Sequence, residues 1–142
     1  MLTETQLLNH IYQTAQMGVE GIDTVLRYAK NPRLIDSLTA QRTEYEKLQS
    51  SADSMLHARG EPSKGISPVA RLSSEAMSTM KAMTDRSSTN IAEMMIQGST
   101  MGVTKSLRTI RDCDLRDGQV RDLADKLLYT EQSNIEEMKK FL

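Results

Sequence analysis

The residues with the clearest potential for metal chemistry in this sequence are Glu131 and Asn134, near the C-terminus. Residues three positions apart on a helix project from the same face. A Glu followed at that spacing by a His supplies a carboxylate and an imidazole, which suit iron or manganese. No Glu in the chain has a His three residues later, and Asn134 stands where the His would be. Of the two residues, only Glu131 is therefore a strong metal ligand.

The first half of the chain offers a comparable pair in Arg42 and Tyr45, with Arg in place of Glu and Tyr in place of His. Two further long helices would each have to supply a Glu, but their inward positions near Gln16 and Thr100 are uncharged. The sequence therefore predicts no di-iron centre, no catalytic residue and no bound cofactor. The two histidines, His10 and His57, are expected near helix ends.

Four polar residues lie on helix faces that otherwise read as apolar, and we expect them to meet in the middle of a bundle: Gln41, Tyr45, Glu131 and Asn134. The favoured interpretation is a hydrogen-bond network that fixes helix register, with Tyr45 donating to Glu131 and Arg42 neutralising the carboxylate. The alternative is an altered iron or manganese site anchored on Glu131. Additional carboxylates for such a site would be Glu20, Glu44, Glu46 and Glu137, although solvated faces suit them better.

Two further candidate sites consist of sulfur-containing residues, a run of methionines and a single cysteine. Met77, Met80 and Met83 are spaced as soft ligands for Cu(I), but the same spacing is typical of an amphipathic helix that covers a bundle. Cys113, the single cysteine, excludes an internal disulfide. It lies beside Arg111 and Asp112 with no evident general base, so we expect a surface thiol without a catalytic role.

A weak internal repeat organises the chain. Residues 7–26 and 90–110 both contain the triplet Met-Gly-Val, at Met17 and at Met101. Apolar residues around the two triplets correspond, so each segment is predicted to form one helix of a hairpin. Gly18 and Gly21 would cost about 1 kcal/mol each in a helix interior relative to Ala, which indicates a close helix crossing.

Boundary signals divide the chain into four long helices, predicted at residues 4–30, 32–59, 90–111 and 119–142. Thr3 with Gln6 forms a capping box, Asn31 with Pro32 starts the second helix, and Gly60 suits the left-handed position that ends it. The sequence thus predicts an all-α, ferritin-like four-helix bundle in one domain, 1–142. Hairpin one covers 1–60, a crossover with a short helix covers 61–89, and hairpin two covers 90–142.

Composition excludes several classes of function. The chain has 18 basic and 19 acidic residues, whereas nucleic-acid and anionic-membrane binding require a clustered positive field. No apolar run approaches the roughly 20 residues of a membrane span, and the N-terminus lacks the pattern of a signal peptide. We therefore expect a cytoplasmic protein with no nucleic-acid or membrane partner.

Four segments make the chain resemble uncharacterised bacterial ferritin-like four-helix proteins, and more loosely the spore coat F group. They are NPRLIDSLTAQRTEYEKL, RGEPSK, IAEMMIQGSTMGV and LLYTEQSNIEEMKKFL. The resemblance implies the bundle fold and, in typical members, a carboxylate–histidine metal centre. Because the ligand positions of this chain depart from that pattern, the favoured function is non-enzymatic, structural or protein-interacting, with self-association as a homodimer. A metal-binding or oxidoreductase protein built around Glu131 is the alternative, and a partner docked on residues 61–89 is a third possibility.

Overall fold

Four long helices make up the computed structural model, which describes residues 1–65 and 84–142. They are α1 (Glu4–Leu26), α2 (Pro32–Ala58), α5 (Ser88–Arg111) and α6 (Gly118–Lys139). The predicted bundle of two antiparallel hairpins is confirmed. The short crossover helix and the Met77, Met80 and Met83 run lie in or across residues 66–83, outside the described part of the chain.

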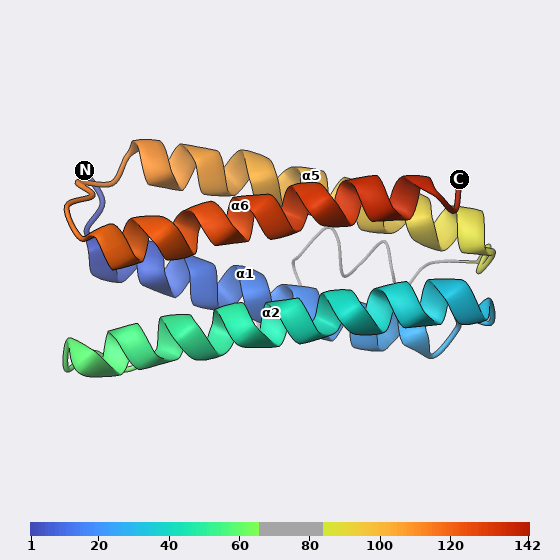
Figure 1. Cartoon of the computed structure of the whole chain (residues 1–142), viewed down its shortest axis with the longest axis horizontal. Helices are drawn as coiled ribbons and strands as arrows, with labels where there is room; N and C mark the ends of the chain where they lie inside the picture. The colour runs from blue at the N-terminus through green and yellow to red at the C-terminus, as the bar shows by residue number, and fades with distance from the viewer. Residues whose placement is uncertain (66–83) are drawn as a thin grey trace.

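The two hairpins lie side by side, and α2 ends at the opposite end of the bundle from the start of α5 (Figure 1). α1 and α2 run antiparallel, as do α5 and α6, and α5 starts at the end of the bundle where α1 finishes. α2 and α5 therefore point one way while α1 and α6 point the other, which is the arrangement of bundles with a single long crossover. In this arrangement α2 and α6 are antiparallel neighbours, so their inward side chains meet at matching heights.

Local capping signals set where the helices begin. Thr3 accepts a hydrogen bond from the Gln6 amide at 3.1 Å, and the Gln6 side chain accepts from the Thr3 amide at 2.9 Å, so the capping box is present. Asn31 caps α2 by accepting from the Arg33 amide at 2.9 Å, with Pro32 in the first turn. Gly60 has φ +72°, as expected for the residue that ends α2.

Three predicted boundaries differ from the structure by more than one residue, and one of them is the end of α6, which lies at Lys139 instead of residue 142. α1 ends at Leu26 instead of residue 30, because the chain needs residues 27–31 to turn into the next helix and Asn31 must be extended before a proline. α5 starts at Ser88, two residues earlier than predicted, because Ser87 and not Asn90 is its cap. The Ser87 hydroxyl accepts from the Asn90 amide at 3.2 Å.

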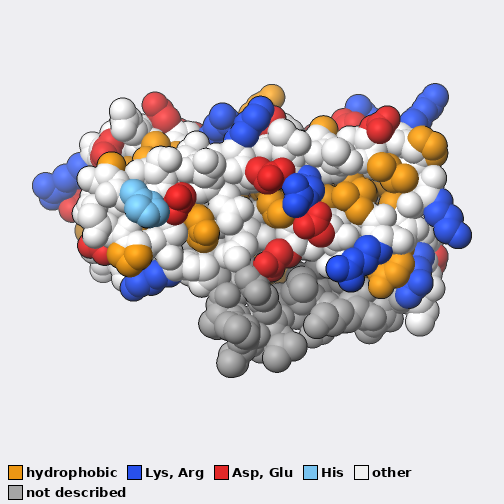
Figure 2. Space-filling model, turned by 90° about the horizontal axis from the view of Figure 1, so that it is seen from below, with side chains coloured by type: hydrophobic (Ala, Val, Ile, Leu, Met, Phe, Trp, Pro, Cys, Tyr) orange, Lys and Arg blue, Asp and Glu red, His pale blue; other side chains and the backbone are white. Residues whose placement is uncertain are grey.

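The core is a column of aliphatic side chains along the bundle axis, interrupted by polar residues near its middle. Near the end of α2 the buried residue is Leu56, whereas Met55 is only partly buried. No helix among residues 1–65 and 84–142 is long and apolar enough to span a bilayer. On the face in Figure 2, acidic and basic side chains of the described residues are interspersed without a patch of one sign.

Candidate functional site

The predicted polar cluster centres on a contact between α2 and α6. The Tyr45 hydroxyl donates to Glu131 Oε1 at 2.9 Å, and each residue is only 3% exposed. Gln41 and Asn134 are also buried, at 5% and 6% exposure. All four predicted residues thus lie in the bundle interior, and the predicted hydrogen bond from Tyr45 to Glu131 is present.

Two glycines from α1 and α5 shape this contact. A Cβ at Gly18 would lie 2.6 Å from the Tyr45 ring, and a Cβ at Gly102 would lie 3.1 Å from the Glu131 carboxyl carbon. Since Gly18 and Gly102 hold the same place in the repeated Met-Gly-Val triplet, their partners correspond as well. Tyr45 in the first hairpin is therefore equivalent to Glu131 in the second. The prediction from sequence that Arg42 is equivalent to Glu131 was wrong by three residues.

Arg42 does not neutralise Glu131, contrary to the sequence interpretation. Its Nε lies 2.6 Å from Asp23 Oδ1, and its Nη1 lies 2.7 Å from Glu46 Oε1. These exposed carboxylates hold the guanidinium on the outer surface of the first hairpin. Glu131 therefore has no ion-pair partner among the described residues.

The electrostatics of the cluster follow from this lack of a counter-ion. Burial raises the pKa of Glu131 to about 7, while hydrogen bonds from Tyr45 and Ser99 act in the opposite direction. Burial also raises the pKa of Tyr45, and the adjacent Glu131 carboxylate adds to this effect. The phenol is therefore neutral at physiological pH, and Glu131 is the group that titrates near neutrality.

Sequence reasoning missed Ser99, which is 5% exposed and interacts with both Tyr45 and Glu131. The expected inward position was Thr100, but Thr100 is exposed and donates to the Ile96 carbonyl at 2.7 Å. Ser99 lies three residues before Gly102, on the same face of α5. The equivalence of Gly18 and Gly102 in the two repeats was thus the sequence signal from which the inward position of Ser99 could have been predicted.

A second polar contact joins α1 to α5. His10 Nε2 lies 2.9 Å from the Ser106 hydroxyl and 3.4 Å from the Thr14 hydroxyl. Burial, with a smaller effect of Lys105, lowers the pKa of His10, so the imidazole is neutral. Ser106 is completely buried and out of reach of a substrate, so we interpret this contact as structural. His57 is exposed at the end of α2, as expected.

Cys113 is buried, whereas the sequence suggested a surface thiol. It is 9% exposed because the N-terminal residue Leu2 pairs with it in an isolated parallel bridge. Burial, with smaller effects of Glu4 and Asp114, raises the pKa of the thiol. A thiol with a raised pKa is a poor nucleophile.

The described residues contain no group of three or more His, Cys, Asp or Glu side chains that could hold a metal ion. Three of the carboxylates considered as additional ligands form ion pairs on the surface instead. Glu44 pairs with Lys47 at 3.2 Å, and Glu137 pairs with Lys140 at 2.8 Å. Glu46 pairs with Arg42, as described above. They are the solvated side chains that their helix positions predicted.

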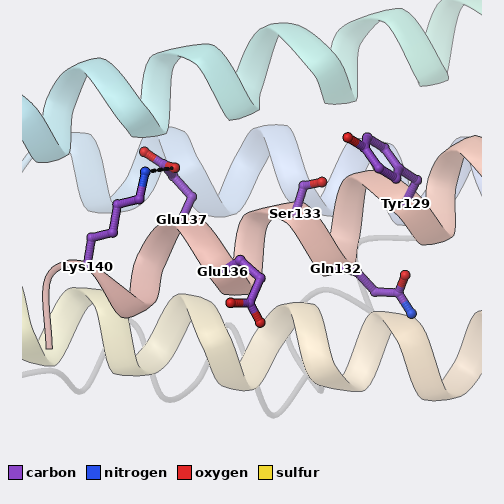
Figure 3. Close-up of a pocket in the computed structure, with 6 residues that line it drawn as sticks. All are labelled: Tyr129, Gln132, Ser133, Glu136, Glu137 and Lys140. Atoms are coloured by element: carbon purple, nitrogen blue, oxygen red, sulfur yellow. Dashed lines mark hydrogen bonds and ion pairs between the residues drawn. The ribbon is translucent and has the colours of Figure 1, made fainter.

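A shallow depression lies over α6, away from the polar cluster (Figure 3). It is lined by a single helix: Tyr129, Gln132, Ser133, Glu136, Glu137 and Lys140. Tyr129 is 71% exposed, so this surface is open to solvent instead of forming an enclosed cavity. We do not regard it as an active site.

Comparison with known proteins supports the fold. The chain is similar to the crystal structure of a DUF305 fragment from Deinococcus radiodurans, with a TM-score of 0.75 and 17% sequence identity. The match covers 96% of this chain and 93% of the other. No protein-family model and no curated protein matches the sequence. At this identity the similarity establishes the four-helix bundle and leaves function to be argued from the residues.

Proposed function

We propose that this protein is a non-enzymatic helical bundle with a structural or protein-interaction role and without a di-iron centre. The observation that carries the proposal is the Tyr45–Glu131 contact. The Tyr45 ring packs on Gly18, and its hydroxyl donates to the carboxylate at the level where di-iron bundles hold their ligands. A carboxylate oxygen that already accepts a hydrogen bond from a phenol is less available to a metal ion.

Elemental analysis tests this proposal. The protein is purified without chelator from cells supplied with iron, manganese and copper in turn. We expect less than about a tenth of an equivalent of each metal, since the site lacks the His and carboxylate partners that give affinity. Stoichiometric iron or manganese that survives gel filtration would refute the proposal.

A metal-binding or oxidoreductase protein with an altered ligand set remains the second candidate, and one observation favours it. Glu131 Oε2 is buried and has no hydrogen-bond partner among the described residues, so one carboxylate oxygen is available. This function requires that Glu131→Ala abolish metal binding while the exposed Glu136→Ala variant retains it. Equal metal content in the two variants would exclude Glu131 as the anchor.

The interaction role that we propose is self-association through the outer surface of α5. Met101 and Leu107 are 40% and 50% exposed on this helix, and Gly98 has open space where a side chain would be. Exposed apolar side chains on a helix favour association with an apolar surface of a partner. Sedimentation velocity over a range of concentrations should show a dimer that Met101→Glu weakens. A monomer at every concentration would disprove the dimer but not the absence of a di-iron centre.

A further inference from the structure

Three buried side-chain atoms beside the Tyr45–Glu131 contact lack a hydrogen-bond partner in the described part of the chain. They are Gln41 Oε1, Glu131 Oε2 and Asn134 Nδ2. A buried polar atom without a partner costs about 1–3 kcal/mol, so native proteins contain few of them. Three such atoms in one cluster indicate a partner other than the side chains of residues 1–65 and 84–142.

The three residues share one level of the bundle. Glu131 accepts a hydrogen bond from the Tyr45 hydroxyl, and Asn134 lies close to the same hydroxyl. Gln41 precedes Tyr45 by one turn on the same face of α2. Because α2 and α6 are antiparallel, moving backward along α2 and forward along α6 leads toward the same end of the bundle. The step from Tyr45 back to Gln41 covers about 6 Å, and the step from Glu131 forward to Asn134 covers about 4.5 Å. Gln41 thus comes opposite Asn134.

The side-chain orientation of Gln41 leaves its oxygen unused. Its Nε2 is directed toward Ser37, one turn away, at 3.4 Å from the hydroxyl. The three atoms are therefore two acceptors, on Gln41 and Glu131, and one donor, on Asn134. A metal cation would suit the two oxygens but would be repelled by the Asn134 amide hydrogens. A water molecule has two hydrogens to donate and accepts in return, which matches all three atoms.

We propose that the middle of the bundle binds one water molecule, which accepts from Asn134 Nδ2 and donates to Gln41 Oε1 and Glu131 Oε2. Small residues on the neighbouring helices suit this site. Gly102 presents bare backbone to the Glu131 carboxyl, and Ser99 is the small polar residue one turn before it. Three hydrogen bonds is the usual number for a buried water.

Oxygen-17 magnetic relaxation dispersion detects long-lived internal water and tests the proposal in solution. We expect the wild-type signal to exceed that of Asn134→Leu by the contribution of one molecule. Gln132→Ala, an exposed change on the same helix, should leave the signal unchanged. Gln41→Met serves in the same way if Asn134→Leu does not fold. Equal signals from the wild type and the folded core variant would overturn the proposal.

A high-resolution crystal structure of the wild type gives the second measurement. The water should lie about 2.7–3.2 Å from each of the three atoms. A direct hydrogen bond from Asn134 to Gln41 with no solvent between them would contradict the proposal. A peak surrounded by oxygens at about 2.0–2.4 Å would also contradict it, because such distances are typical of a bound cation.

Discussion

Glu131 is the one buried carboxylic acid in the middle of the described bundle, and its chemistry depends on pH. Its pKa is about 7 in the folded protein because burial disfavours the charge and no cation compensates for it. In the unfolded chain the same group has a pKa near the ordinary 4.5. The folded state therefore binds this proton more tightly than the unfolded state.

The sign of the resulting pH dependence follows by linkage. The contribution of Glu131 to the free energy of unfolding is complete below pH 4.5 and is lost as pH rises to 7, by about 3 kcal/mol in all. Glu131→Gln keeps an acceptor for Tyr45 but cannot ionise. We expect its stability relative to the wild type to increase between pH 5 and pH 8. Urea titrations across this range measure the difference, and parallel stability curves would show that Glu131 has an ordinary pKa.

Tyr45→Phe removes the donor and leaves the ring in place over Gly18. We expect a loss of about 2 kcal/mol at pH 8, where the hydrogen bond is made to a charged carboxylate. A smaller loss of about 1 kcal/mol is expected at pH 5, where Glu131 is neutral. Denaturant unfolding at the two pH values measures both losses. The exposed Tyr129→Phe variant is the control and should match the wild type. A pH-independent loss would mean that Glu131 does not change its charge in this range.

At the scale of the helices, glycines with different surroundings have opposite roles. Gly18 in α1 faces the Tyr45 ring, so its missing side chain lets α1 and α2 approach closely. Gly98 in α5 faces open space and has no such packing partner within the described bundle. Both lie in helix interiors, where glycine is intrinsically unfavourable. The same substitution at each position therefore separates packing from helix propensity.

We expect Gly98→Ala to stabilise the protein by up to about 1 kcal/mol, the gain in helix propensity. Gly18→Ala should destabilise it by about 1–2 kcal/mol, because the added methyl lies 2.6 Å from a ring that cannot move aside. Thermal unfolding of both variants measures the difference. Combining Gly18→Ala with Tyr45→Leu should recover part of the loss. A stabilising Gly18→Ala would show that the crossing is looser than the structure indicates.

Sequence reasoning predicted the helices and their caps well, since Thr3, Asn31 and Gly60 act through neighbours within a few residues. It also predicted the contact between Tyr45 and Glu131, because buried polar positions on facing helices have few other partners. The carboxylates that the Arg42 side chain pairs with could not be predicted from burial patterns in this way. Its two partners, Asp23 and Glu46, could not be distinguished from Glu131 on the sequence alone, and only the packed structure decides which carboxylates it meets.

The burial of Cys113 could not be predicted from the sequence either, because it depends on contact with a segment more than a hundred residues away. Leu2 pairs with Cys113, and nothing local to either residue indicates this contact. Ser99 is an intermediate case. Its position could be derived from the glycine match between the repeats, but only with the correct register. Local signals are thus readable from one sequence, whereas long-range contacts require the fold.

At the scale of the whole molecule, one end of the bundle is held together by charge. Arg59, after α2, lies 2.9 Å from Asp117, the cap of α6, and 3.6 Å from Glu4 in the first turn of α1. Glu4 Oε2 also accepts from the backbone amides of Arg116 and Asp117, at 3.0 and 2.7 Å. Three helices are therefore connected through Glu4.

Glu4→Ala should lower the melting temperature by several degrees, because it leaves the amides of Arg116 and Asp117 without their acceptor and removes one of the two ion-pair partners of Arg59. Asp125→Ala, which removes an exposed acidic residue from α6, should have little effect. Differential scanning calorimetry at low and high salt separates the two kinds of contact, since only the ion pair is screened. Equal melting temperatures for the two variants would mean that Glu4 does not connect the helices.

The pairing of Leu2 with the link between α5 and α6 has a consequence for synthesis on the ribosome. The Leu2 amide donates to the Asp112 carbonyl at 2.7 Å, and the Asp114 amide donates to the Leu2 carbonyl at 3.1 Å. The pairing of Leu2 can therefore form only after residues 112–114 have been synthesised. A nascent chain can complete hairpin one before the segment that pairs with Leu2 exists.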